Sequence, residues 1–158
     1  MLSYMLGDLA DANGLDWTIR SAGTHVSEGL AMSSRTRSAL LAIPELGEHR
    51  YGQHRSHQID ASDIAWADVI LAAELDHVRY VRQVFGGDVA CVQLGHFIAH
   101  ARPGETVHAQ LVAMGAQSET ATLDVADPAG GDQADYDACA RQLWSYARAF
   151  AVLVASPA

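Results

Sequence analysis

The chain has 158 residues, of which 49% are hydrophobic and 18% charged, and it carries a formal net charge of -9 at pH 7. This length suits one domain over residues 1–158, large enough to bury roughly 70% of the surface of its unfolded form. The negative charge disfavours partners such as nucleic acid or anionic membrane, and no apolar run approaches the roughly 20 residues that span a bilayer. The sequence shows no secretory signal and no disulfide framework, so we expect a cytoplasmic protein.

Helices and strands alternate along the first half of the chain. Apolar residues from Leu2 to Leu9 recur at helical spacing up to Asn13 and Gly14, which predicts a first helix. The elements expected next are a strand at Trp17–Arg20, a helix from about Ser34 to Ile43, a strand at Asp68–Ala73 and a helix at Glu74–Phe85.

The second half continues this pattern with an interruption. We predict a strand at Val89–Leu94, a weakly patterned insertion from Gly95 to Thr122 containing a short helix at Val107–Met114, and a final helix at about Asp135–Val154. Alternating strands and helices indicate an α/β fold with a parallel sheet, right-handed crossovers and helices on both faces. The ligand crevice of such a sheet lies at the carboxyl ends of its strands, where we expect Ser21 to His25 and Gly95-His96.

One stretch before the final helix combines chemistry with rigid geometry: Val125-Ala126-Asp127-Pro128-Ala129-Gly130-Gly131. Pro128 fixes its own φ and favours extended geometry at Asp127, while the glycines allow a tight reversal before Asp132 or Asp135 caps the helix. A carboxyl group held on such a loop can protonate a leaving group. The alternative interpretation is a turn followed by a helix cap, without catalysis.

Two further segments accompany the Asp-Pro stretch, Ser21-Ala22-Gly23-Thr24-His25 and His54-Arg55-Ser56-His57-Gln58-Ile59. In this order and spacing, the three segments resemble the low-molecular-weight protein tyrosine phosphatase family, from Met1 almost to the end of the chain. The resemblance implies a three-layer, flavodoxin-like fold with a four-stranded parallel sheet. It also implies hydrolysis of phosphotyrosine or another aryl phosphomonoester through a cysteinyl-phosphate intermediate. The histidines show no recognisable zinc-ligand spacing, so we expect no metal, and we expect no other cofactor.

The nucleophile of that reaction does not appear in this sequence. In the family a central strand and a Cys-x5-Arg-Ser-Pro loop precede the first helix, whereas this chain begins with residues resembling that helix. Phe97 lies six residues after Cys91 and Ser145 lies six after Cys139, so neither cysteine begins the motif. We therefore expect a chain that is truncated at its N-terminus relative to the family, inactive as given, and prone to self-association through the sheet edge left open.

The resemblance assigns roles to three residues: Asp127 as the general acid, and Thr24 and His25 in substrate binding. Ala129 and Gly130 stand where family members place aromatic residues against the substrate ring, which weakens the expectation of phosphotyrosine and leaves a different phosphomonoester open. We interpret His54 and Arg55 as structural and both cysteines as core thiols.

Two hypotheses remain open for the chain as a whole. It is either a phosphatase acting on a phosphorylated protein or small aryl phosphate once the loop is restored, or a catalytically dead interaction or regulatory module of the same fold. A flavodoxin-like ligand-binding domain is disfavoured, since no glycine-rich phosphate loop is present.

Overall fold

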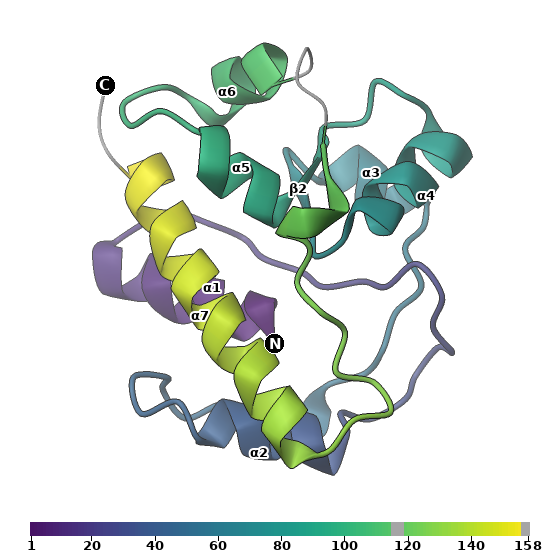
Figure 1. Ribbon diagram of the computed structural model, residues 1–158, viewed down its shortest axis with the longest axis vertical. Helices are drawn as coiled ribbons and strands as arrows, with labels where there is room; N and C mark the ends of the chain where they lie inside the picture. The colour runs from purple at the N-terminus through teal and green to yellow at the C-terminus, as the bar shows by residue number, and fades with distance from the viewer. Residues whose placement is uncertain (115–118, 156–158) are drawn as a thin grey trace. The chain divides into compact units, whose positions relative to one another are not determined.

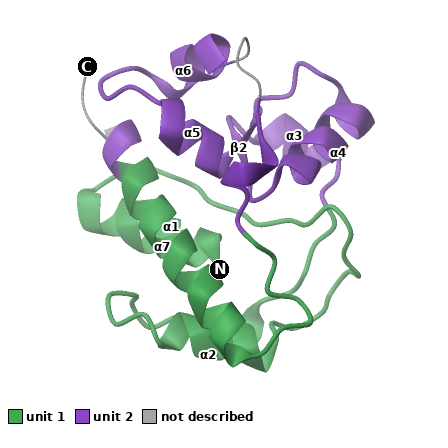
Figure 2. Cartoon of the chain, viewed as in Figure 1, with its two compact units in different colours: residues 1–58, 126–151 green, residues 59–125, 152–158 purple. Residues whose placement is uncertain are grey.

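The computed structural model describes residues 1–114 and 119–155. The chain divides into two compact units: unit 1 comprises Met1–Gln58 and Ala126–Ala151, and unit 2 comprises Ile59–Val125 and Val152–Ala158 (Figure 2). No helix in the described part of the chain has both the length and the apolar character needed to cross a membrane.

Unit 1 is built from helices and long connecting segments (Figure 1). Its elements are α1 (Leu2–Asn13), α2 (Ser34–Leu41), the short 3-10 helix η1 (Tyr51–Gln53) and α7 (Gln133–Ala155), of which the residues to Ala151 belong to this unit. One face of α7 supplies much of the buried apolar surface, through Cys139, Ala140, Leu143, Trp144, Ala147 and Phe150. The apolar spacing of the sequence therefore located the first and last helices correctly.

The strand predicted at Trp17–Arg20 is wrong, because these residues form no strand. The Trp17 ring packs against Phe150, with ring centroids 5.7 Å apart, and its backbone N–H donates to Leu15. In unit 1 the only β-pairing that follows is one parallel bridge between Gly23 and Gln58. Extended, apolar residues become a strand only when a neighbouring backbone pairs with them, and propensity does not report that neighbour.

Unit 2 contains a parallel β-α-β motif, so the predicted parallel sheet with helices is confirmed. Strand β1 (Ile70–Ala72) leads through α4 (Leu75–Phe85) to β2 (Cys91–Gln93), in the register Ile70↔Cys91, Leu71↔Val92 and Ala72↔Gln93. The described residues form a sheet of two strands, fewer than the four that the resemblance implied, and both strands are shorter than predicted. Ile59, Ala72, Val78, Val81 and Cys91 form one buried apolar cluster of this unit.

The remaining elements of unit 2 are helices: α3 (Ala61–Trp66), α5 (Leu94–His100), α6 (Val107–Met114) and the 3-10 helix η2 (Ala121–Leu123). α6 has the predicted bounds. α5 was not predicted, but it begins directly after β2, so Gly95 and His96 follow the carboxyl end of that strand as expected. Gly95 is required there because a Cβ atom on it would lie 2.2 Å from the Leu123 carbonyl oxygen, so α5 and the η2 backbone pass in close contact.

Candidate active site

The Asp127 side chain is held by its own loop in unit 1. Its Oδ1 accepts the backbone N–H of Ala129 at 2.9 Å, and the N–H of Gly131 donates to the Pro128 carbonyl at 2.9 Å. Gly130 has φ 84°, a left-handed conformation that glycine adopts without strain. Asp127 itself is exposed. The loop thus presents a carboxyl group to solvent with one oxygen engaged by the backbone.

A reciprocal cap at the start of α7 fixes the far end of this loop. Asp132 Oδ1 accepts the N–H groups of Ala134 at 2.8 Å and Asp135 at 3.2 Å, while Asp135 Oδ2 accepts the N–H of Asp132 at 2.9 Å. Both aspartates that the sequence offered as caps therefore serve together. These bonds satisfy N–H groups that the first turn of a helix otherwise leaves without acceptors.

Gln133 ties the beginning of α7 to α2. Its Nε2 donates to the Arg35 carbonyl at 3.1 Å and to Asp137 Oδ1 at 2.8 Å. Because Gln133 lies six residues after Asp127, this contact anchors the helix end from which the loop departs. The carboxyl group of Asp127 is therefore supported on a capped and anchored helix terminus.

Neither cysteine is suited to act as a nucleophile. Burial raises the pKa of Cys91 in unit 2 to about 12. Burial also raises the pKa of Cys139 on α7, and the nearby Asp127 carboxylate acts in the same direction. A thiol must ionise to attack, so both side chains are neutral core groups near neutral pH.

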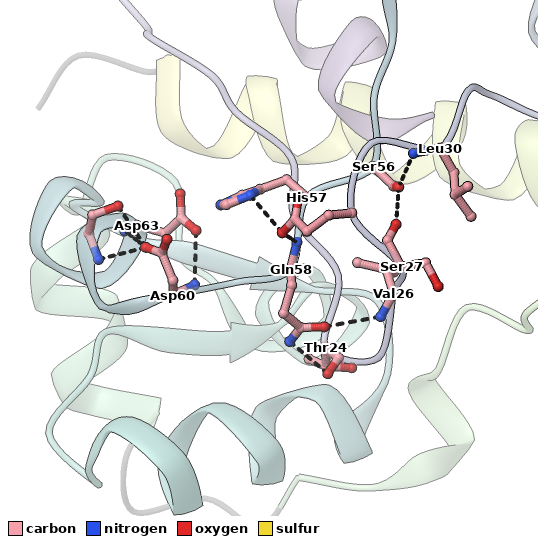
Figure 3. Close-up of polar contacts among 11 residues, drawn as sticks. Thr24, Val26, Ser27, Leu30, Ser56, His57, Gln58, Asp60 and Asp63 are labelled. Carbon is pink, nitrogen blue, oxygen red and sulfur yellow. Dashed lines mark hydrogen bonds and ion pairs between the residues drawn. The ribbon is translucent and has the colours of Figure 1, made fainter.

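Thr24 and His25 begin a loop that is fastened along its length to residues 56–58 of the same unit (Figure 3). Thr24 is buried, whereas His25 is exposed. The N–H of Gly23 donates to the His57 carbonyl at 2.9 Å. The N–H of Gly29 donates to the Ser56 carbonyl, and the N–H of Ser56 donates to the Leu30 carbonyl, both at 2.8 Å.

The Ser56 and Glu28 side chains fasten the same loop. Ser56 Oγ accepts the N–H of Leu30 at 2.9 Å and donates to the Ser27 carbonyl at 2.5 Å. Glu28 Oε1 lies 3.2 Å from His57 Nδ1 and accepts the N–H of Gln58 at 2.6 Å. The sequence interpretation placed Ser56 and Gln58 in a family-like segment but assigned these contacts neither to them nor to Glu28, because contacts across about 30 residues leave no local periodicity.

The contacts of His54 and Arg55 fit the structural interpretation of this pair. Arg55 Nη1 donates to the backbone carbonyls of Gly52 at 3.0 Å and His54 at 2.6 Å, so it folds back onto its own segment. Burial lowers the pKa of His54, and the Arg55 charge adds to this shift. His49 Nε2 lies 2.8 Å from Asp8 Oδ1. These side chains are engaged in local contacts of unit 1.

Solved structures similar to this chain share its fold at low sequence identity. A low-molecular-weight protein tyrosine phosphatase from T. tengcongensis has a TM-score of 0.71 at 20% identity and covers 94% of this chain and 86% of its own. The YwlE arginine phosphatase from Geobacillus stearothermophilus has a TM-score of 0.66 at 23% identity, covering 94% and 82%. Vibrio vulnificus Wzb, solved with benzylphosphonate, has a TM-score of 0.68 at 16% identity, covering 95% and 86%.

Among curated proteins, none matches this sequence. The model of one protein family, described as low molecular weight phosphotyrosine protein phosphatase, matches residues 1–156. That match includes the Asp-Pro loop, the segment from Ser21 to His25 and the segment from His54 to Ile59. The chain therefore belongs to the low molecular weight phosphotyrosine protein phosphatase family.

Proposed function

We propose that Asp127 is the general acid of a phosphomonoester hydrolase site within a single phosphatase-like domain, and that Thr24 and His25 lie on the loop that recognises the substrate. The observation that carries this proposal is the geometry of the Asp127 loop. Ala129 occupies Oδ1, so the proton to be delivered resides on Oδ2 of the exposed carboxyl group. A leaving oxygen within hydrogen-bond reach of Oδ2 would receive that proton as its bond to phosphorus breaks.

Residues 1–158 do not supply the thiolate that the cysteinyl-phosphate route needs. The sequence contains no Cys-x5-Arg, and burial raises the pKa of both Cys91 and Cys139. Without a thiolate and an anion cradle, both the covalent route and most of the charge stabilisation are lost. We therefore expect these residues alone to be inactive, which also supports the alternative function of a catalytically inactive interaction module.

The substrate that we infer is a phosphorylated protein or a small aryl phosphate, with weak selectivity for the ring. Ala129 and Gly130 offer no aromatic surface beside Asp127, and an aromatic contact contributes about 0.5 to 1.5 kcal/mol beyond area burial. Recognition then depends mainly on the phosphoryl group and on the loop that carries His25.

The experiment fuses the strand and Cys-x5-Arg-Ser-Pro loop of a family member in front of Met1 and measures turnover of two substrates. We expect Asp127→Asn to slow hydrolysis of phenyl phosphate by about 10²–10⁴-fold, because its leaving group needs a proton. Hydrolysis of 2,4-dinitrophenyl phosphate should change far less, because that leaving group departs as a stable anion. Equal losses on both substrates would mean that Asp127 only shapes the loop.

Two controls accompany this experiment. Asp132→Asn alters the helix cap without removing the acid, so it should affect the two substrates equally. The unfused chain should not hydrolyse p-nitrophenyl phosphate above buffer. Turnover by the unfused chain that disappears in Cys91→Ser or Cys139→Ser would contradict the assignment of both cysteines as core thiols.

We also infer self-association through the outer edge of β1 in unit 2. The N–H of Ile70 donates to the Ala90 carbonyl at 2.8 Å, so the backbone of Ile70 faces β2. In a parallel sheet successive residues of a strand face opposite sides, so the N–H and C=O of Leu71 point away from β2. The outer edge of β2 is blocked, because Arg82 Nη2 donates to the Cys91 carbonyl at 3.1 Å. Sedimentation should show a dimer that Leu71→Pro abolishes, and a strictly monomeric chain would contradict this inference.

A further inference from the structure

The Gln58 side chain forms hydrogen bonds with the backbone of Thr24 and of Val26 (Figure 3). Its Nε2 donates to the Thr24 carbonyl at 2.8 Å, and its Oε1 accepts the N–H of Val26 at 3.0 Å. The two bonded groups belong to the residues immediately before and after His25. A carboxamide has a donor and an acceptor on one planar group, so it can complete both bonds at once.

Neighbouring contacts hold Gln58 itself in place. Its backbone N–H donates to Glu28 Oε1, and its backbone pairs with Gly23 in the parallel bridge. The loop is therefore bound by Gln58 at residues 24 and 26, and by Ser56 at residues 27 and 30. Each side chain thus makes a separate pair of hydrogen bonds with the segment, and we call each pair a clasp. Only the Gln58 clasp bonds the residues on both sides of His25.

We infer that Gln58 is a positioning residue, which fixes the backbone of His25 so that its exposed imidazole is presented in one orientation. This inference rests on the proposed role of His25 in substrate recognition. A loop ordered before the substrate arrives does not lose that conformational freedom on binding. The residues from Val26 to Leu30 are all exposed, so the polar clasps replace the apolar packing that orders other segments.

The two clasps can be separated by amide hydrogen exchange measured by NMR on residues 1–158. Gln58→Leu removes the acceptor of the Val26 N–H, so this amide should exchange at least about tenfold faster and the His25 ring signals should shift. The Leu30 amide, bonded to Ser56 Oγ, should stay within about twofold of the wild type. Ser56→Ala should give the reverse pattern.

Gln53→Leu is the matched control, since it makes the same substitution at an exposed residue of unit 1 outside the loop. It should leave the Val26 and Leu30 amides and the His25 ring signals unchanged. Unchanged His25 signals and Val26 exchange in a folded Gln58→Leu chain would overturn the inference. Equal acceleration of both amides in both variants would also overturn it, because the loop would then open as one unit.

Gln58→Glu keeps the test decisive if Gln58→Leu fails to fold. At pH 7 the carboxylate still accepts from Val26 but cannot donate to the Thr24 carbonyl, whereas a protonated carboxyl group can do both. Relative to the wild type at each pH, the His25 signals should be displaced at pH 7 and restored near pH 4. Displacement that persists at acidic pH would contradict positioning by the amide-like bond pair.

None of these measurements depends on turnover. A negative result removes Gln58 as a positioning residue and leaves the acid role of Asp127 untouched. Conversely, a fused enzyme that shows no dependence on Asp127, together with the predicted exchange pattern, would refute the proposed function and retain the role of Gln58 in ordering the loop.

Discussion

The Asp124 side chain joins two elements of unit 2, the start of α4 and strand β2. Its Oδ1 accepts the N–H of Leu75 at 2.7 Å and Nε2 of Gln93 at 2.5 Å. Leu75 is the first residue of α4, and the preceding Glu74 makes no side-chain cap. Gln93 is fully buried in β2 and donates in addition to the Thr120 carbonyl at 3.1 Å. Asp124 thus caps a helix from 49 residues away and accepts a hydrogen bond from the buried Nε2 of Gln93.

Asp124→Ala removes the acceptor from both groups at once. Loss of a helix cap costs typically about 1 kcal/mol, and a buried donor left without its partner costs about 1–3 kcal/mol. Gln93 keeps its bond to Thr120, which reduces the second figure. We therefore expect the free energy of unfolding to fall by about 1.5–3 kcal/mol, a large part of the 5–15 kcal/mol typical of a domain.

Urea unfolding followed by circular dichroism measures this change, and exchange of the Leu75 amide locates it. Asp124→Asn is the matched variant, because its carbonyl oxygen can still accept both bonds, and it should lose less than about 1 kcal/mol. A loss below about 0.5 kcal/mol for Asp124→Ala would refute the reasoning. An Asp124→Asn chain as unstable as Asp124→Ala would show that charge, rather than the acceptor, is what matters.

Two further predictions concern unit 2. Gly95→Ala should destabilise the chain by about 1–3 kcal/mol in the same assay, because the new methyl group would collide with the Leu123 carbonyl. Gly87→Ala is the control: nothing lies within 4 Å of the new methyl group, so stability should change by less than about 0.5 kcal/mol. Burial lowers the pKa of His96, the neighbouring His100 and the more distant Arg82 act in the same direction, and Glu119 opposes them. The folded state therefore binds this proton more weakly than the unfolded state, so stability should fall as the pH drops below about 6.5, and His96→Gln should flatten that dependence between pH 7.5 and 5.5. An unchanged slope would contradict the assignment to His96.

The parts of the structure that sequence analysis predicted are those fixed by nearby residues. The Asp127 turn and the cap of α7 by Asp132 and Asp135 both depend on neighbours a few positions away. Proline, glycine and aspartate have strong local preferences for backbone conformation and capping, so their positions in the sequence predict such turns and caps.

The parts that it missed depend on distant partners. Gln58 meets residues 32 and 34 positions away, and Asp124 meets a helix 49 positions away. Trp17–Arg20 has the composition of a strand but no strand beside it in unit 1. Composition and periodicity report the conformational preference of a segment by itself. Whether the segment joins a β-ladder or a polar clasp depends on which other segment lies beside it in the fold.

The Asp-Pro loop restricts where an aromatic side chain could follow Asp127. A side chain at Gly130 would have to adopt φ 84°, and a Cβ at Gly131 would lie 2.3 Å from Asp135 Oδ2, displacing the cap of α7. Of the three residues that follow Pro128, only Ala129 could carry an aromatic ring without disturbing the turn. The tight turn that presents the carboxyl group thus excludes the ring contacts at two positions. If Asp127 acts as the acid, the selectivity for the substrate depends mainly on the loop around His25, which Gln58 holds in place.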